Sequence, residues 1–178
     1  MQQLIFDLLK ITIPAVLVLV MGYLIIQKFL LKETERQRLA IFQQNASQSL
    51  TLRLQAYERL CIFVERMHPS SLIGRYYIQQ ATAHDIQLAM VQGIRSEWEH
   101  NVSQQLYVSS ETWMTIKTVM EQEITMLNRV GASLQLGAPA SDFIKLISEQ
   151  VLSSESTMPT SIALEQLNKE AKFLLFGS

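Results

Sequence analysis

The feature that most constrains this chain is its longest stretch without a charged side chain. The stretch runs for 17 residues from Ile11 to Gln27, and apolar residues resume as Phe29-Leu30-Leu31 after Lys28. With Leu4 to Leu9 as an interfacial first turn, a helix here covers a hydrocarbon core of about 30 Å, which needs roughly 20 residues. A cleavable signal peptide would end in a small-x-small site, and none follows Gln27. The sequence therefore predicts a single transmembrane anchor within residues 1–31.

The basic residues that flank this segment predict its orientation. Lys28, Lys32, Arg36 and Arg38 follow the apolar run, whereas only Lys10 precedes it. Because cytoplasmic flanks carry the excess of Lys and Arg, this asymmetry predicts an N-terminus outside and residues 32–178 in the cytoplasm. The expected location is the bacterial inner membrane, with the lipid bilayer as one partner.

Composition points to an all-α fold. The chain has only 6 Gly and 4 Pro in 178 residues, too few for the turns of a sandwich, barrel or Rossmann fold. Its 15 basic and 16 acidic residues leave no clustered positive excess, so nucleic acid is not an expected partner. The single cysteine excludes an intramolecular disulfide.

Residues 32–49 are predicted to continue the anchor as a helical stalk. Leu39, Phe42 and Ala46 keep a three-to-four spacing that could support a short coiled-coil seam. The segment Asn45–Ser49 weakens the helix without a Gly or Pro to end it. Either a short break or one continuous helix to Met67 is compatible with the sequence.

Residues 50–178 are predicted to form a bundle of about five helices. Thr82 with Asp85 resembles a capping box, Ser109 or Ser110 is a candidate cap, and Pro159 suits a first helical position. Residues 70–77 are expected to be irregular. The expected helices cover residues 50–67, 82–105, 110–131, 142–152 and 159–176.

Apolar spacing predicts which faces of these helices are buried. The 50–67 helix has apolar residues on two adjoining faces, which suggests a central element of the bundle. The expected rows are Leu50, Leu54, Tyr57, Cys61 and Val64; Ala56, Leu60, Phe63 and Met67; Val91, Ile94, Trp98 and Val102; and Trp113, Ile116, Met120, Ile124 and Leu127.

Two Glu-x-x-His elements are the sharpest candidates for chemistry. Ferritin-like di-metal bundles use two such pairs and one further Glu from each of two other helices. The pairs here are Glu65 with His68 and Glu97 with His100, and Glu121, Glu123 or Glu149 could supply the remaining ligands. With 3 His in the chain and His68 next to Pro69 at a helix end, chance spacing is the simpler interpretation. The di-metal site is kept as the alternative function.

No nucleophile, phosphate-binding loop or metal motif stands out elsewhere. Cys61 could pair with His68, His84 or His100, but its place on an apolar row favours a core cysteine. The sequence therefore predicts a protein that is not an enzyme and needs no cofactor.

Polar residues on two helices suggest a network that pairs helices or recognises a partner. Arg53, Arg59 and Arg95 are the expected partners of the carboxylates. Structural pairing is the simpler interpretation and a recognition surface the bolder one. The candidate residues are Arg53, Tyr57, Glu58, Arg59, Glu97, Trp98, Glu99, His100 and Asn101.

Two of these segments carry a resemblance to a known family. Arg53-Leu-Gln-Ala-Tyr-Glu-Arg-Leu60 and Glu97-Trp-Glu-His-Asn-Val-Ser-Gln-Gln-Leu-Tyr-Val-Ser109, followed by Trp113, resemble an uncharacterised family of bacterial single-pass membrane proteins, a domain of unknown function. The resemblance covers nearly the whole chain. It implies the anchored topology and assigns no activity.

Together these features predict a membrane-anchored helical interaction or scaffold protein. The expected role is a non-catalytic subunit of an inner-membrane assembly. Its expected partners are other membrane subunits or a second copy of the chain, met through the stalk.

Overall fold

The structure is a computed structural model that describes the backbone of residues 2–154 and 158–177, and the side chains of residues 3, 16–153 and 158–177. The secondary-structure elements in these ranges are all helical, with a single isolated bridge between Thr82 and Pro139, which agrees with the all-α prediction. The elements are α1 (Gln2–Met67), α2 (Pro69–Tyr76), α3 (Ala83–Asn101), the 3-10 helix η1 (Val102–Leu106), α4 (Ser110–Ala132), α5 (Ala140–Ser154) and α6 (Pro159–Phe176).

The chain divides into two compact units, Met1–Ser49 and Leu50–Ser178, here called unit 1 and unit 2. Helix α1 passes through the boundary without a break, so the second of the two open alternatives holds and Asn45–Ser49 is helical. From Val16 to Ser49 every side chain of unit 1 is exposed, apart from the intermediate Gly22.

The predicted transmembrane anchor is wrong. Within the described residues, none of the helices has an apolar stretch long enough, and poor enough in charge, to cross a bilayer. The structure describes the side chains of this apolar run from Val16 onward. Twelve uncharged residues lie from Val16 to Gln27, Lys28 ends the stretch, and Lys32 and Glu33 follow. A span needs roughly 20 apolar residues. The single-pass topology and the inner-membrane location built on it are overturned with it.

The orientation argument loses its basis for the same reason. Lys28, Lys32, Arg36 and Arg38 lie on exposed positions of α1, and the described helices include no membrane span for them to orient. The side chain of Lys10 lies outside the described residues.

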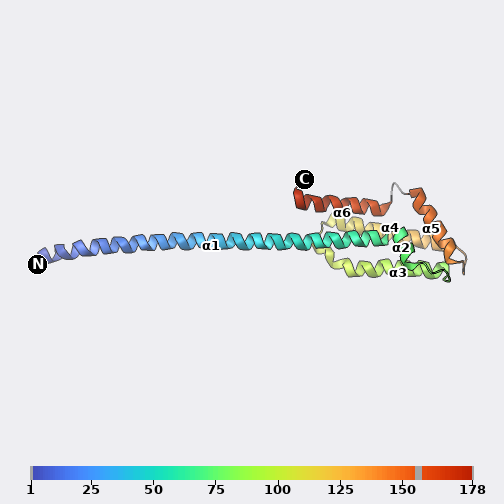
Figure 1. Ribbon diagram of the computed structural model, residues 1–178, viewed down its shortest axis with the longest axis horizontal. Helices are drawn as coiled ribbons and strands as arrows, with labels where there is room; N and C mark the ends of the chain where they lie inside the picture. The colour runs from blue at the N-terminus through green and yellow to red at the C-terminus, as the bar shows by residue number, and fades with distance from the viewer. Residues whose placement is uncertain (1, 155–157, 178) are drawn as a thin grey trace. The chain divides into compact units, whose positions relative to one another are not determined.

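Unit 2 is a helical bundle built around α4. Figure 1 shows α3 and α6 running beside α4, and all three share one hydrophobic core with the last turns of α1. Phe63 from α1, Leu127 from α4 and Leu167 from α6 are among its fully buried members. The two predicted rows of the 50–67 helix supply Ala56, Tyr57, Leu60, Phe63, Val64 and Met67 to the buried set.

Helix α3 buries a different row from the expected one. Its buried residues are Ala83, Ile86, Met90 and Ile94. Of the expected members only Ile94 is fully buried, while Val102 is 44% exposed because the chain has left the α-helix there for η1. The i, i+4 row that begins at Ile86 therefore faces the core.

Local start signals explain most helix boundaries. Thr82 and Asp85 form the predicted capping box, Ser109 accepts a hydrogen bond from the Thr112 amide at 3.1 Å, and Pro159 opens α6. The expectation of an irregular stretch at 70–77 is wrong. Helix α2 begins at Pro69, and the His68 Nδ1 atom accepts a hydrogen bond from the Ser70 amide at 3.3 Å.

Candidate functional site

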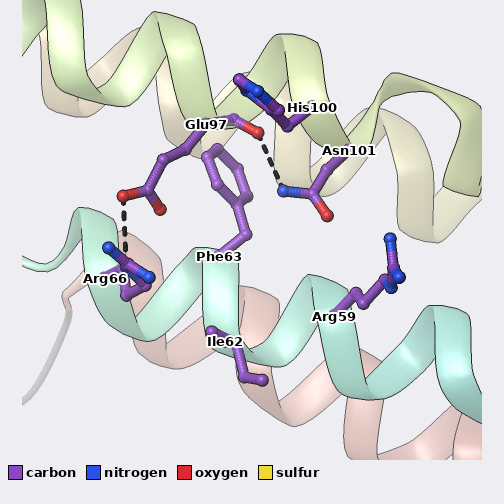
Figure 2. Close-up of a pocket in the computed structure, with 7 residues that line it drawn as sticks. All are labelled: Arg59, Ile62, Phe63, Arg66, Glu97, His100 and Asn101. Carbon is purple, nitrogen blue, oxygen red and sulfur yellow. Dashed lines mark hydrogen bonds and ion pairs between the residues drawn. The ribbon is translucent and has the colours of Figure 1, made fainter.

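A shallow groove of about 380 Å³ lies between the last turns of α1 and the end of α3. Figure 2 shows Phe63 pointing from α1 toward α3, with charged side chains on either side of it. Four of the nine candidate polar residues line this groove, and the other five, Arg53, Tyr57, Glu58, Trp98 and Glu99, do not. The lining residues are Arg59, Ile62, Phe63, Arg66, Glu97, His100 and Asn101.

Glu97 is the centre of the groove's polar contacts. Its Oε1 atom lies 3.1 Å from Arg66 Nε and 2.6 Å from Arg75 Nη1. Its main-chain oxygen accepts a hydrogen bond from Asn101 Nδ2 at 2.8 Å, and His100 Nδ1 lies 2.6 Å from the Ser96 carbonyl oxygen. Glu97 therefore joins a polar network with Arg66 and Arg75, neither of which the sequence analysis named as a partner.

The arginines that complete this network differ from the predicted ones. Arg66 lies in the last turn of α1 and Arg75 in the last turn of α2, a segment that the sequence had suggested was irregular. Arg53, by contrast, donates to the Tyr107 carbonyl oxygen at 3.2 Å. Helix α2 thus places the Arg75 guanidinium against Glu97. Helical spacing along α1 and α3 alone does not reveal this contact.

The other candidate residues separate into packing and surface positions. The Trp98 ring stacks on Trp113 at 4.4 Å between centroids and lies 5.8 Å from Phe63. Glu58 and Glu99 are exposed. These side chains stabilise or border the bundle and do not converge on one reacting centre.

A second polar cluster, which the sequence did not reveal, surrounds Glu170 on α6. Its Oε1 atom accepts hydrogen bonds from Tyr57 Oη at 2.7 Å and from the Ser109 amide at 2.9 Å. Its Oε2 atom accepts from Ser109 Oγ at 2.9 Å and from Thr112 Oγ1. One carboxylate therefore ties α1 and α6 to the N-terminus of α4, where the helix dipole also favours negative charge.

The environment of this cluster shifts two pKa values in opposite directions. Burial and the hydrogen bond to Glu170 raise the pKa of Tyr57 to about 12. Burial would raise the pKa of Glu170, but hydrogen bonds from Thr112, Tyr57 and Ser109 outweigh it and lower that pKa. The pair is therefore a neutral phenol donating to an ionised carboxylate, which is a structural contact.

The residues of the di-metal hypothesis do not gather. Among the described residues there is no group of three or more His, Cys, Asp or Glu that could hold a metal ion. His68 caps α2, Glu97 pairs with two arginines, and Glu65 is exposed. Of the three further carboxylates, Glu121 and Glu149 are exposed and only Glu123 is buried.

Cys61 is half-buried against the core, as an apolar-row cysteine should be. Burial, with a smaller contribution from Glu65, raises the pKa of its thiol. A raised pKa lowers the thiolate fraction, so the environment does not activate this sulfur as a nucleophile.

Fold and site together define an all-α bundle protein whose polar clusters hold helices together. The chain belongs to a family of unknown function, DUF7935, whose model matches residues 3–174. Comparison of the chain with curated proteins and with solved structures found no match.

Proposed function

We propose that this protein is a non-catalytic helical interaction protein that assembles with further copies of itself through unit 1. The observation that carries the proposal is the exposure of the segment Val16–Leu31. Its large hydrophobic side chains are between 47% and 73% exposed, and Lys28 is its only charged residue. These side chains are Val16, Leu17, Val18, Leu19, Val20, Met21, Tyr23, Leu24, Ile25, Ile26, Phe29, Leu30 and Leu31.

Such a surface favours association strongly. Burying one large apolar side chain contributes about 1.5–3 kcal/mol, so covering half of this set supplies on the order of 10 kcal/mol before the cost of association. Exposed apolar patches of this extent mark interaction sites. Within unit 2, the Glu170 and Glu97 clusters hold the helices together.

A second copy is the occupant that the segment fits best. The segment is nearly free of charge, so it offers no electrostatic feature for a charged partner, whereas an identical segment matches it in length and polarity. Because apolar residues occur on nearly all faces, one neighbouring helix covers only one stripe. We therefore propose an assembly of more than two copies, extended by the exposed Leu39 and Phe42.

The test is the mass of the full chain by light scattering over a range of concentrations. We expect a species larger than a dimer. A variant with Leu19→Asn and Ile26→Asn should shift to lower mass, while the matched control with Gln43→Asn and Gln44→Asn, on exposed polar positions of the same helix, should not. Circular dichroism checks that the helices persist in both.

Cysteine cross-linking gives a second readout that does not depend on destabilising the segment. In a Cys61→Ala background, single cysteines at positions 18 to 21 sample every face of the helix, and cross-links at all four support an assembly of several copies. A single-chain mass at all concentrations would contradict the proposal, and so would a single chain that sediments with neutral lipid vesicles.

A further inference from the structure

A separate cavity of about 260 Å³ lies in unit 2 between α4, α5 and the start of α6. Glu123 and Met158 are its buried members, with exposed fractions of 3% and 7%. Half-buried apolar side chains form its walls, and exposed polar residues form its rim. The lining residues are Gln122, Glu123, Met126, Arg129, Gln150, Val151, Met158 and Pro159.

The Glu123 carboxylate of this cavity lacks a hydrogen-bond donor for one of its oxygens. Its Oε2 atom is fully buried and has no hydrogen-bond partner among the residues that the structure describes. Buried polar side-chain atoms are nearly always paired, so an unpaired oxygen on a carboxylate that lines a cavity calls for a donor from outside the described residues. Gln122 and Arg129 are exposed at the rim and do not supply one.

We propose that this cavity binds a small organic molecule with a primary ammonium group on a short apolar chain, and that the ammonium donates to Glu123. The apolar walls of Met126, Val151 and Pro159 then cover the chain of the ligand. The cavity volume of 260 Å³ restricts the ligand to a few carbon atoms, since drug-sized pockets start at about 300 Å³.

Other ligand classes fit the same residues less well. An anion would face a carboxylate, and a neutral alcohol offers a weaker donor than a charged ammonium. A metal ion lacks ligands here, because no cluster of three ligating side chains exists among the described residues. Among the described residues that line the cavity, Arg129 is the only other charged one, and its place at the rim disfavours a ligand with a second positive charge.

The pKa of Glu123 makes the pH dependence of ligand affinity a second test of the proposal. Burial raises the pKa of its carboxyl to about 7, with no charged neighbour contributing. Arg129 of α4 faces the cavity, while α5 and the start of α6 contribute only uncharged residues to it. Because the ammonium pairs with the ionised form, affinity should rise about tenfold between pH 6 and pH 8.

Ligand-observed saturation-transfer NMR on the full chain tests the proposal with pentylammonium, pentanol and pentanoate as probes. This method tolerates a large assembly, so its outcome is independent of the state of unit 1. We expect pentylammonium to bind better than both other probes, and to bind better at pH 8 than at pH 6. Equal signals from pentylammonium and pentanol would overturn the proposal.

Three variants locate the interaction. Glu123→Gln should reduce the preference for pentylammonium over the other two probes at least tenfold. The matched Glu121→Gln, two residues away on the exposed face, should keep this preference. Val151→Phe fills the cavity without touching the charge and should abolish binding of every probe. Retention of pentylammonium binding by either Glu123→Gln or Val151→Phe, with tryptophan fluorescence showing a folded unit 2, would assign it to another place and refute the site.

Discussion

Replacing Glu123 by Gln should stabilise the protein at alkaline pH and leave it nearly unchanged at acidic pH. Glu123 is 3% exposed, and its buried Oε2 atom has no partner within the described part of the chain. Desolvation penalises the ionised form, which raises the pKa from 4.5 to about 7. The isosteric amide keeps the shape of the side chain and cannot ionise.

The sign and size of the effect follow from proton linkage. The folded state holds the Glu123 proton more tightly than the unfolded state, so the stability due to this group is fully present below pH 4.5 and is lost as pH rises through about 7. At 1.36 kcal/mol per pH unit, the raised pKa corresponds to a loss of about 3 kcal/mol by pH 8.5. The variant should escape this loss.

Urea unfolding followed by tryptophan fluorescence measures the difference. Trp98 and Trp113, the 2 tryptophans of the chain, stack on each other within unit 2 and therefore report on this unit. We expect Glu123→Gln to exceed the wild type by about 3 kcal/mol at pH 8.5 and by under about 1 kcal/mol at pH 5. The exposed Glu121→Gln should stay within about 0.5 kcal/mol of the wild type at both pH values. A constant difference between Glu123→Gln and the wild type across this range would refute the reasoning.

Two further substitutions test the packing of unit 2 by the same unfolding assay. Gly93→Ala should lower the free energy of unfolding by about 1–3 kcal/mol, because the added Cβ atom would meet the ring of Tyr76. Gly74→Ala has nothing within 4 Å of its added Cβ atom and should leave this free energy unchanged or raise it by up to about 1 kcal/mol. Equal effects of the two substitutions would show that α2 and α3 are not this close. Glu170→Ala should lower the free energy of unfolding by about 2–4 kcal/mol, because it leaves hydroxyl groups from α1 and α4 without their acceptor. The control Glu165→Ala, at an exposed position of the same helix, should change it by under about 0.5 kcal/mol. A similar loss of stability in both variants would argue against the Glu170 cluster.

Helix starts were predictable because their signals are local. Thr82 with Asp85, Ser109, and Pro159 each satisfy exposed amides or fix φ within one turn, and no distant residue is needed. Helix α2 also had such a signal, since Pro69 occupies its first turn after His68. Its length of 8 residues was too short for an apolar period to show.

The partners of the polar side chains were not predictable from spacing. Tyr57 and Glu170 are 113 positions apart, and Arg75 reaches Glu97 only because α2 folds back beside α3. Helical periodicity specifies which residues share a face of one helix, but it does not say which helix packs against that face. The candidate list therefore included Glu97 but missed its partners Arg66 and Arg75, and it did not include Glu170.

Glu170 and Glu123 show what a carboxylate does when packing decides its surroundings. Both are on helices of unit 2, with Glu123 buried and Glu170 partly buried, yet the pKa of Glu170 is lowered and that of Glu123 is raised. The difference lies in the donors, since Glu170 accepts four hydrogen bonds whereas one Glu123 oxygen accepts none. The fold supplies the hydrogen-bond donors for the Glu170 carboxylate, which explains why its ionised form is stable. One oxygen of Glu123 has no donor among the described residues, and Glu123 lines a cavity of 260 Å³, so an external donor at this cavity would complete its hydrogen bonding.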